Sequence, residues 1–222
     1  MKLALFDLDG TLLATDSDHA FGEFVVALGW ADAAQHRHRN DAFYADYLAG
    51  TLDIHSYVDF ATSPWRGRTP QELAQATSRF LHEVVQPALH PAALELVRQH
   101  QRAGDQVAIV TATNDFVTRP IAQLFGVHEL IATELARDAG GRATGAICGV
   151  PAFREGKVAR VQAWLAARGD TPGSFERSIF YSDSTNDLPL LEWVSHPVAT
   201  NPGPALERVA RERGWPVLNL FT

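Results

Sequence analysis

Short, continuous runs of apolar residues recur along the chain and predict buried β-strands. The three clearest runs span residues 2–6, 106–110 and 178–182, and shorter runs at 130–133 and 197–200 predict flanking strands. Because the apolar residues do not alternate with polar ones, both faces of these strands should be covered, as in a parallel sheet with crossover helices. The pattern therefore predicts an α/β architecture.

Helical patterns lie between these runs. A helix is predicted at residues 91–103, which begin with a proline and are followed by Gly104, and a second at 156–168, which Gly169 ends. Residues 137–149 are rich in glycine and predict a small hairpin. The chain should thus form a doubly wound, Rossmann-like parallel sheet with helices on both faces.

About a hundred residues separate the first two predicted strands, far more than a crossover helix needs. Residues 16–86 contain few strand-like runs, so they predict a helical insertion, with one break at 63–70. An insertion directly after the first strand would lie above the strand ends. We therefore expect a catalytic core of residues 1–14 plus 87–222 and a helical cap domain of residues 15–86.

Composition narrows the classes of protein. The 222 residues are 46% hydrophobic and 20% charged, which is a normal globular balance, and the net charge of −7 argues against nucleic acid or an anionic membrane as partner. The lone Cys148 can form neither an internal disulfide nor a cysteine zinc site. We expect a cytoplasmic protein, a monomer or homodimer without a membrane span, that acts on a small metabolite.

Carboxylates follow the predicted strands at the edge where ligands bind in open α/β sheets. Asp7 and Asp9 follow the first strand, Thr111 the second, and Asp183 and Asp187 the third. Four carboxylates in one crevice repel one another unless a cation lies among them, and an all-oxygen donor set favours Mg²⁺. Asp7 or Asp9 alone would be read as the end of a strand; three such clusters together predict a metal site.

This arrangement suits phosphoryl transfer. Asp7 is the candidate nucleophile, because a carboxylate can accept a phosphoryl group, and Asp9 could protonate the leaving alcohol and then activate water. The hydroxyl of Thr111 and the amide of Ala112 could bind phosphate oxygens. Lys157 could supply the remaining positive charge, although an ordinary solvated helix lysine is an equal reading of that residue.

Four segments resemble the motifs of the haloacid dehalogenase superfamily, in order and over essentially the whole chain: DLDGT at 7–11, the segment at Thr111, Lys157, and SDSTND at 182–187. The resemblance implies Asp7 as nucleophile, Asp9 as acid and base, and Mg²⁺ held by Asp7, the Asp9 carbonyl and Asp183. It further implies phosphate binding by Thr111 and Lys157. Asn186 and Asp187 would support the substrate or the metal, Asp187 directly or through a water.

The insertion is similar to the cap of the phosphoserine phosphatase-like branch (subfamily IB). Asp16 falls where that branch places an acidic residue for the substrate amine, but Ala61 stands where it uses an arginine for the substrate carboxylate. Bacterial histidinol-phosphatase-like members resemble the chain more, since their substrate has an amine and no carboxylate. Asp16 and Asp18 would suit a cationic ring-bearing alcohol phosphate, together with cap aromatic residues: Phe43, Tyr44, Tyr47 and Trp65.

Phosphoserine is the alternative substrate, and two other classes of protein share parts of the pattern. A phosphorylated signalling module also uses an acceptor aspartate and a lysine, but it has no use for an acid/base such as Asp9. A phosphomutase would pass the phosphoryl group to a second sugar hydroxyl. His36 and His38 are predicted to lie on a solvated surface rather than to bind zinc, because arginines flank them.

Overall fold

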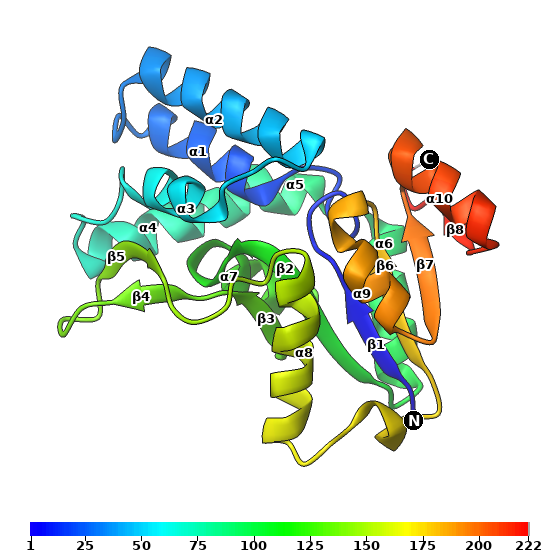
Figure 1. The fold of residues 1–222 in the computed structure, drawn as a ribbon. Helices are drawn as coiled ribbons and strands as arrows, with labels where there is room; N and C mark the ends of the chain where they lie inside the picture. The colour runs from blue at the N-terminus through cyan, green and yellow to red at the C-terminus, as the bar shows by residue number, and fades with distance from the viewer. Residues whose placement is uncertain (222) are drawn as a thin grey trace.

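The protein, described here by a computed structural model covering residues 1–221, is built on a six-stranded parallel sheet in the order β3-β2-β1-β6-β7-β8 (Figure 1). Residue 222, the last of the predicted core, lies outside the described residues. The strands are β1 (Leu3–Phe6), β2 (Gln106–Asn114), β3 (Leu130–Thr133), β6 (Ser178–Ser182), β7 (His196–Thr200) and β8 (Val217–Leu218). The five predicted strands are confirmed, β2 is longer than predicted, and β8 was not predicted.

Helices cover both faces of the sheet, which confirms the doubly wound architecture. Helices α6 (Pro91–Arg102) and α7 (Asp115–Leu124) pack on the face to which Ala4 and Phe6 point. Helices α8 (Glu155–Ala167), α9 (Leu188–Trp193) and α10 (Pro204–Arg213) pack on the face of Leu3 and Leu5. All four of these β1 side chains are fully buried, as expected of a central parallel strand.

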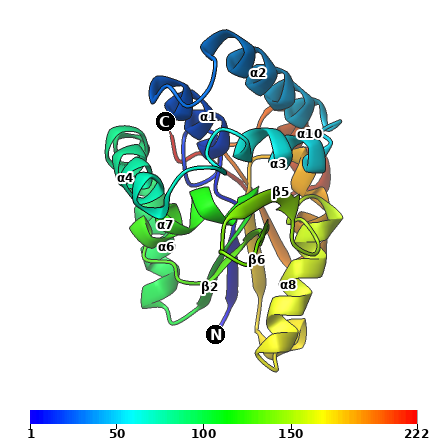
Figure 2. The same cartoon turned by 90° about the vertical axis from the view of Figure 1, so that its left-hand side faces the viewer.

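A helical layer of residues 17–88 lies over the carboxyl end of the strands (Figures 1 and 2). It comprises α1 (Ser17–Ala27), α2 (Ala33–Ala49), α3 (Ile54–Thr62), α4 (Pro70–Phe80), a π-helix (Leu81–Val85) and α5 (Gln86–Ala88). Side chains of Asp16, Asp32, Asp53 and Thr69 cap the first four helices by accepting backbone N–H bonds. The predicted break at 63–70 is the loop between α3 and α4.

Two neighbouring segments join the helical layer to the sheet. Leu13, on the way out from β1, forms an isolated antiparallel bridge with Leu89, on the way back to α6. Leu13 is fully buried, so the crossing point is held by packing as well as by the backbone.

The predicted hairpin is also present. Strands β4 (Leu135–Arg137) and β5 (Ala143–Ile147) pair antiparallel and pack against α3 of the helical layer. Arg66, just beyond α3, donates a hydrogen bond of 2.8 Å to the carbonyl oxygen of Thr144. Short 3₁₀ turns at Pro172–Ser174 and Thr185–Asp187 complete the secondary structure of the described residues.

One surface prediction is wrong. His38 is exposed as predicted, but His36 is buried and stacks on Phe60 of α3, with ring centroids 4.6 Å apart. The flanking arginines gave no sign that the side of α2 carrying His36 packs against α3. Desolvation by this burial lowers the pKa of His36. Within residues 1–221, no helix has the length and apolar character needed to cross a bilayer.

The start of α8 gives a test of the packing. A Cβ added to Gly156 would lie 2.0 Å from the backbone oxygen of Pro151, whereas one added to Gly67 would meet open space. We expect Gly156→Ala to lower the free energy of unfolding by about 2 kcal/mol or more, because backbone atoms must move to relieve the overlap. Thermal unfolding measures this, with Gly67→Ala as the control, and equal midpoints for the two variants would contradict it.

Candidate active site

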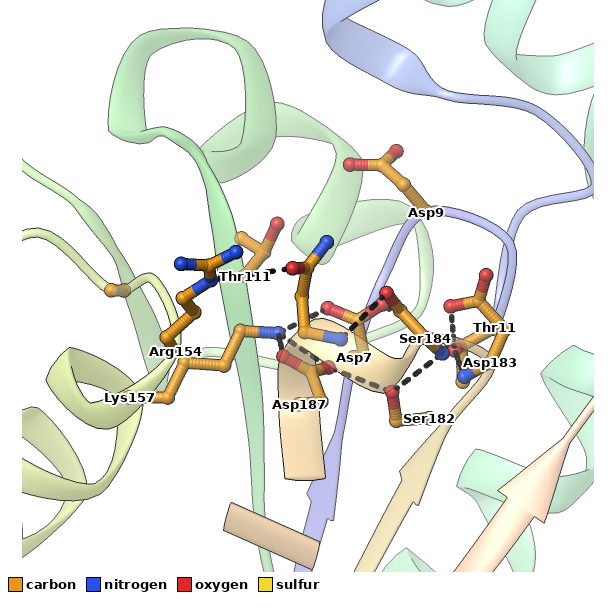
Figure 3. A network of polar contacts seen from close by, with 12 residues as sticks. Asp7, Asp9, Thr11, Thr111, Arg154, Lys157, Ser182, Asp183, Ser184 and Asp187 are labelled. Atoms are coloured by element: carbon orange, nitrogen blue, oxygen red, sulfur yellow. Dashed lines mark hydrogen bonds and ion pairs between the residues drawn. The ribbon is translucent and has the colours of Figure 1, made fainter. Parts of the chain in front are cut away.

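Carboxylates from two strand ends meet at the edge of the sheet beneath the helical layer. Asp7 directly follows β1 and Asp183 directly follows β6, so the parallel pairing of these strands brings them together. The hydroxyl oxygen of Thr11 lies 3.1 Å from Asp183 Oδ1 and 3.4 Å from Asp7 Oδ2, and it accepts the Asp183 N–H at 3.0 Å (Figure 3). The two strand ends therefore form one acidic site.

Lys157 is the cation of this site. Its ammonium group lies 2.7 Å from oxygens of both Asp7 and Asp187, and its side chain is 1% exposed, which excludes the reading as a solvated lysine. Asp187 also accepts a hydrogen bond of 2.7 Å from the Ser182 hydroxyl. Burial alone would lower the pKa of Lys157, but the attraction of Asp187 and Asp7 outweighs it and raises the pKa, so the lysine stays charged.

One ammonium group does not balance the surrounding carboxylates. Burial raises the pKa of Asp7 to about 7, although Lys157 opposes this shift. Desolvation, with repulsion from Asp7 and Asp187, raises the pKa of Asp183 well above its usual range. A cation placed close to Asp7 and Asp183 would counteract these shifts, because it stabilises the ionised form of a carboxyl group.

The acidic site fits a magnesium ion through mixed oxygen donors. Among residues 1–221, no three His, Cys, Asp or Glu side chains gather into a metal-binding group. The predicted set contains two carboxylates, Asp7 and Asp183, and the backbone carbonyl of Asp9. Gly10, with φ of 73°, lets the DLDGT turn pass so close to Asp183 that a Cβ there would lie 2.3 Å from its Oδ2. Hard oxygen donors lacking positive charge match the preference of Mg²⁺.

Asp9 stands above Asp7 in Figure 3, outside the network of dashed contacts that joins Lys157, Asp7 and Asp187. Its Oδ1 accepts the backbone N–H of Ser17 at 2.7 Å, and its Oδ2 accepts the hydroxyl of Thr113 at 2.9 Å. Desolvation, with repulsion from Asp16, raises the pKa of Asp9 to about 8. A carboxyl group with this pKa can carry a proton near neutral pH.

A cavity opens between the acidic site and the helical layer. Its floor includes Asp7 and Asp9, together with Thr111 and Ala112 from the end of β2. The Thr111 oxygen accepts the Thr113 N–H at 3.2 Å, so the Thr111 hydroxyl proton can be donated to a ligand. These predicted phosphate-binding residues therefore share one space with the predicted nucleophile.

The roof of the cavity is aromatic and acidic. Phe43, Tyr44 and Tyr47 line it as predicted, but Trp65 does not: it is 2% exposed and stacks on Phe116, with centroids 4.3 Å apart. His19, whose Nε2 pairs with Asp41 at 2.9 Å, also lines the cavity. The sequence pattern could not show which cap aromatic residues point inward.

Asp16 and Asp18 both reach the cavity. Asp16 caps α1 through one oxygen, Oδ1, which accepts the N–H groups of Asp18 and His19. Asp18 accepts a hydrogen bond of 3.2 Å from the Asn114 side chain. Desolvation raises the pKa of Asp16, and desolvation with repulsion from Asp16 raises that of Asp18 to about 7. This end of the cavity would favour a cation.

Asn186 lies at the junction with the helical layer. Its Nδ2 donates to the carbonyl oxygen of Tyr47 at 2.9 Å, and its Oδ1 accepts from Arg154 Nε at 3.4 Å. Arg154 also donates to the carbonyl oxygen of Gly50, so two core side chains bind the C-terminal end of α2. In this conformation the Asn186 amide is engaged with the helical layer rather than directed into the cavity.

Sequence reasoning named the charged groups and missed the neutral ones that hold them. Thr11, Ser182 and Thr113 each bond a carboxylate of the site. Thr11 and Ser182 stand inside the quoted motifs, so their position was a usable signal. Nothing in the sequence indicated that the Ser17 N–H or Thr113 would reach Asp9.

Comparisons with known proteins identify the family of the chain. A family model described as haloacid dehalogenase-like hydrolase matches residues 4–192. A histidinol-phosphatase of Neisseria meningitidis serogroup C (strain 8013) is 45% identical over 218 residues, which are 98% of this chain and 98% of the relative. A phosphoserine phosphatase of Mycobacterium tuberculosis (strain ATCC 25618 / H37Rv) is 30% identical over 217 residues, covering 96% of this chain and 69% of the relative.

Solved structures show the same fold. A protein with unknown function from Bordetella pertussis Tohama I superposes with a TM-score of 0.93 at 48% identity, covering 99% of both chains. A substrate-bound phosphoserine phosphatase superposes with a TM-score of 0.69 at 16% identity, over 98% of this chain and 92% of the other, and shares the fold alone. The chain therefore belongs to the haloacid dehalogenase-like hydrolase family and groups with its phosphoric monoester hydrolases.

Proposed function

We propose that the protein is a Mg²⁺-dependent phosphatase that hydrolyses histidinol phosphate through an aspartyl-phosphate intermediate. The observation that carries this proposal is the buried ion pair between Asp7 and Lys157, because Asp7 lines the floor of a cavity whose far end is acidic. The floor suits a phosphate group and the far end suits a cation.

We further propose that two parts of the chain have separate roles. Residues 1–14 and 87–222 would form the catalytic core, and residues 15–86 a cap that closes over it. The paired Leu13 and Leu89 support this division, since both connections cross at one place where a hinge would act.

The lone Cys148 is exposed and unpaired among the described residues, which supports a reducing compartment such as the cytoplasm.

In the first half-reaction, a carboxylate oxygen of Asp7 attacks phosphorus and the bond to the ester oxygen breaks. Asp9, which can carry a proton at neutral pH, donates it to the departing alkoxide. Lys157 stabilises charge on the phosphoryl oxygens while it holds the other carboxylate oxygen of Asp7. The products are the free alcohol and phosphorylated Asp7.

In the second half-reaction, water attacks the phosphorus of phosphorylated Asp7. Asp9, now ionised, accepts the proton of that water, and the Asp7 carboxylate and inorganic phosphate are released. Thr111 and Ala112 would bind the phosphoryl oxygens through the hydroxyl and amide groups that line the floor. The same carboxyl group thus serves as acid and then as base.

Asp7, Asp183 and the Asp9 carbonyl would hold Mg²⁺ beside the nucleophile. The bound ion would supply positive charge to the phosphate and to the surrounding carboxylates. Asp187 is already bonded to Lys157 and Ser182, so we infer that it acts by positioning the lysine and reaches the metal through water.

Substrate choice would lie at the roof of the cavity. Histidinol phosphate carries an ammonium group, which Asp16 and Asp18 can pair with, and a ring, which Phe43 and Tyr44 can contact. The match to a Neisseria histidinol-phosphatase over nearly the whole chain supports this substrate. The weaker match to a mycobacterial phosphoserine phosphatase makes phosphoserine the second candidate. Ala61 argues against phosphoserine, because it is uncharged and stands where phosphoserine phosphatases use an arginine to bind the substrate carboxylate.

Catalysis by Asp7 is tested by conservative substitution. With Mg²⁺ present, we expect Asp7→Asn to lower phosphate release by a factor of about 10³ or more, because an amide is a poor nucleophile, while thermal unfolding stays cooperative. Treatment with EDTA should abolish wild-type activity, and added Mg²⁺ should restore it. Asp170→Asn, a change at the loop after α8, is the matched control and should keep full activity.

Three outcomes of that assay would oppose the proposal. Activity of Asp7→Asn close to that of Asp170→Asn would remove the nucleophile. One phosphate transferred per molecule without turnover would indicate a signalling module. Isomerised sugar phosphate without free phosphate would indicate a phosphomutase.

Substrate preference is tested with two esters. We expect kcat/KM for L-histidinol phosphate to exceed that for L-phosphoserine by about 100-fold or more. Asp16 and Asp18 repel a carboxylate, and the described residues that line the cavity include no arginine to bind it. Measuring both esters over a range of salt concentrations checks this. A preference for phosphoserine would overturn the assignment and leave the phosphatase chemistry intact.

The buried carboxyl groups of the roof should make the free energy of unfolding depend on pH. The pKa of Asp18 is about 7 in the folded state, above its unfolded value of 3.8, so the folded chain holds this proton more tightly than the unfolded chain. The contribution of Asp18 to the free energy of unfolding is therefore fully present at low pH and is lost as the pH rises through 7. Without metal or substrate, Asp18→Asn should gain on the wild type by on the order of 2–3 kcal/mol between pH 5 and pH 8. Denaturant unfolding measures this, with exposed Asp46→Asn as control; parallel curves would contradict it.

A further inference from the structure

The Asp9 carboxyl group is held by neutral groups from two distant parts of the chain. Its Oδ1 accepts the Ser17 N–H at 2.7 Å, and its Oδ2 accepts the Thr113 hydroxyl at 2.9 Å. Among residues 1–221, no Lys, Arg or His side chain forms an ion pair with Asp9. Hydrogen bonding alone therefore orients this carboxyl group.

Two hydrogen bonds fix the plane of the Asp9 carboxyl group, which a single hydrogen bond would leave free to rotate. The torsion that rotates a carboxyl group about its Cβ–Cγ bond has broad minima, so a single hydrogen bond at Oδ1 leaves the plane of the group loosely defined. A second bond at Oδ2, from a different element, fixes the plane. The proton that Asp9 must deliver then leaves from a defined position.

Thr113 is well placed to make that second bond. It lies near the end of the buried strand β2, is 8% exposed, and its own N–H donates to the Thr111 oxygen at 3.2 Å. The next residue, Asn114, caps α7 through its side chain. Because Thr113 is β-branched, its side chain has few accessible rotamers, and its hydroxyl group has little rotational freedom.

We propose that Thr113 is a positioning residue whose hydroxyl group holds the Asp9 carboxyl group in the orientation for proton transfer to the leaving alcohol. This inference rests on the proposed phosphatase function, in which Asp9 is the acid. Thr113 forms no bond to phosphorus or to the leaving group in this account and acts only through Asp9.

Leaving groups of different basicity separate positioning from packing. An alkoxide such as that of 2-glycerol phosphate needs a proton as it departs, whereas p-nitrophenolate departs without one. For Thr113→Val, which keeps the shape and removes the hydroxyl, we expect kcat/KM to fall by about 10- to 100-fold for 2-glycerol phosphate. For p-nitrophenyl phosphate it should fall by less than about threefold. The parameter kcat/KM is chosen because it reports the steps up to loss of the alcohol.

Two variants serve as controls. Thr113→Ser restores a hydroxyl at the same place and should recover most of the activity on 2-glycerol phosphate. Thr118→Val removes another buried hydroxyl, one that bonds the Asn114 carbonyl and not Asp9, and should leave the ratio between the two esters unchanged. Thermal unfolding of all variants reports on folding separately.

Each outcome bears on the inference. A selective loss on the alkyl ester, rescued by serine, supports positioning by Thr113. An equal loss on both esters, or no loss on either, overturns it while the active wild type leaves the proposed function standing. A wild type inactive on every phosphomonoester would overturn the proposed function, and the role of Thr113 with it.

Discussion

Excess negative charge at one edge of the sheet is the constraint around which this molecule is organised. Asp7 and Asp187 share the ammonium group of Lys157, and Asp183 lies close to Asp7 through Thr11. Asp9, Asp16 and Asp18 add further carboxyl groups along the cavity. The pKa of each of Asp7, Asp9 and Asp18 rises to about 7 or 8, chiefly through desolvation. A bound cation would offset the repulsion among these carboxyl groups and so stabilise the folded chain.

The fold tolerates this cost because the carboxylates stand on rigid supports. Strand β1 is fully buried between two layers of helices, and the pairing of β1 with β6 places Asp7 and Asp183 side by side without long flexible connections. Neutral donors then satisfy individual oxygens: Thr11 between the two strand ends, and Ser182 at Asp187. Hydrogen bonds of this kind orient a charge but do not neutralise it, so the demand for a cation persists.

The sequence predicted the parts of this site that backbone topology places, and missed those that packing places. Continuous apolar runs located the strands, and parallel pairing alone then brought Asp7 and Asp183 together. The burial of Trp65 against Phe116 and the burial of His36 depend on how helices rotate against one another, which no local sequence pattern records. Strand β8 has only two residues, so the sequence contains no apolar run long enough to predict it.

The junction between the helical layer and the core lies next to the segment that carries Lys157. Carbonyl oxygens of Tyr47 and Gly50, at the C-terminal end of α2, accept hydrogen bonds from Asn186 and Arg154. A helix C-terminus carries partial negative charge, so the Arg154 guanidinium suits this end. Arg154 has φ of 52°, an uncommon conformation for a residue with a side chain, and it immediately precedes the helix that carries Lys157. Arg154 thus both contacts the end of α2 and begins the helix that presents the ammonium group to Asp7, so one residue connects the helical layer with the acidic site.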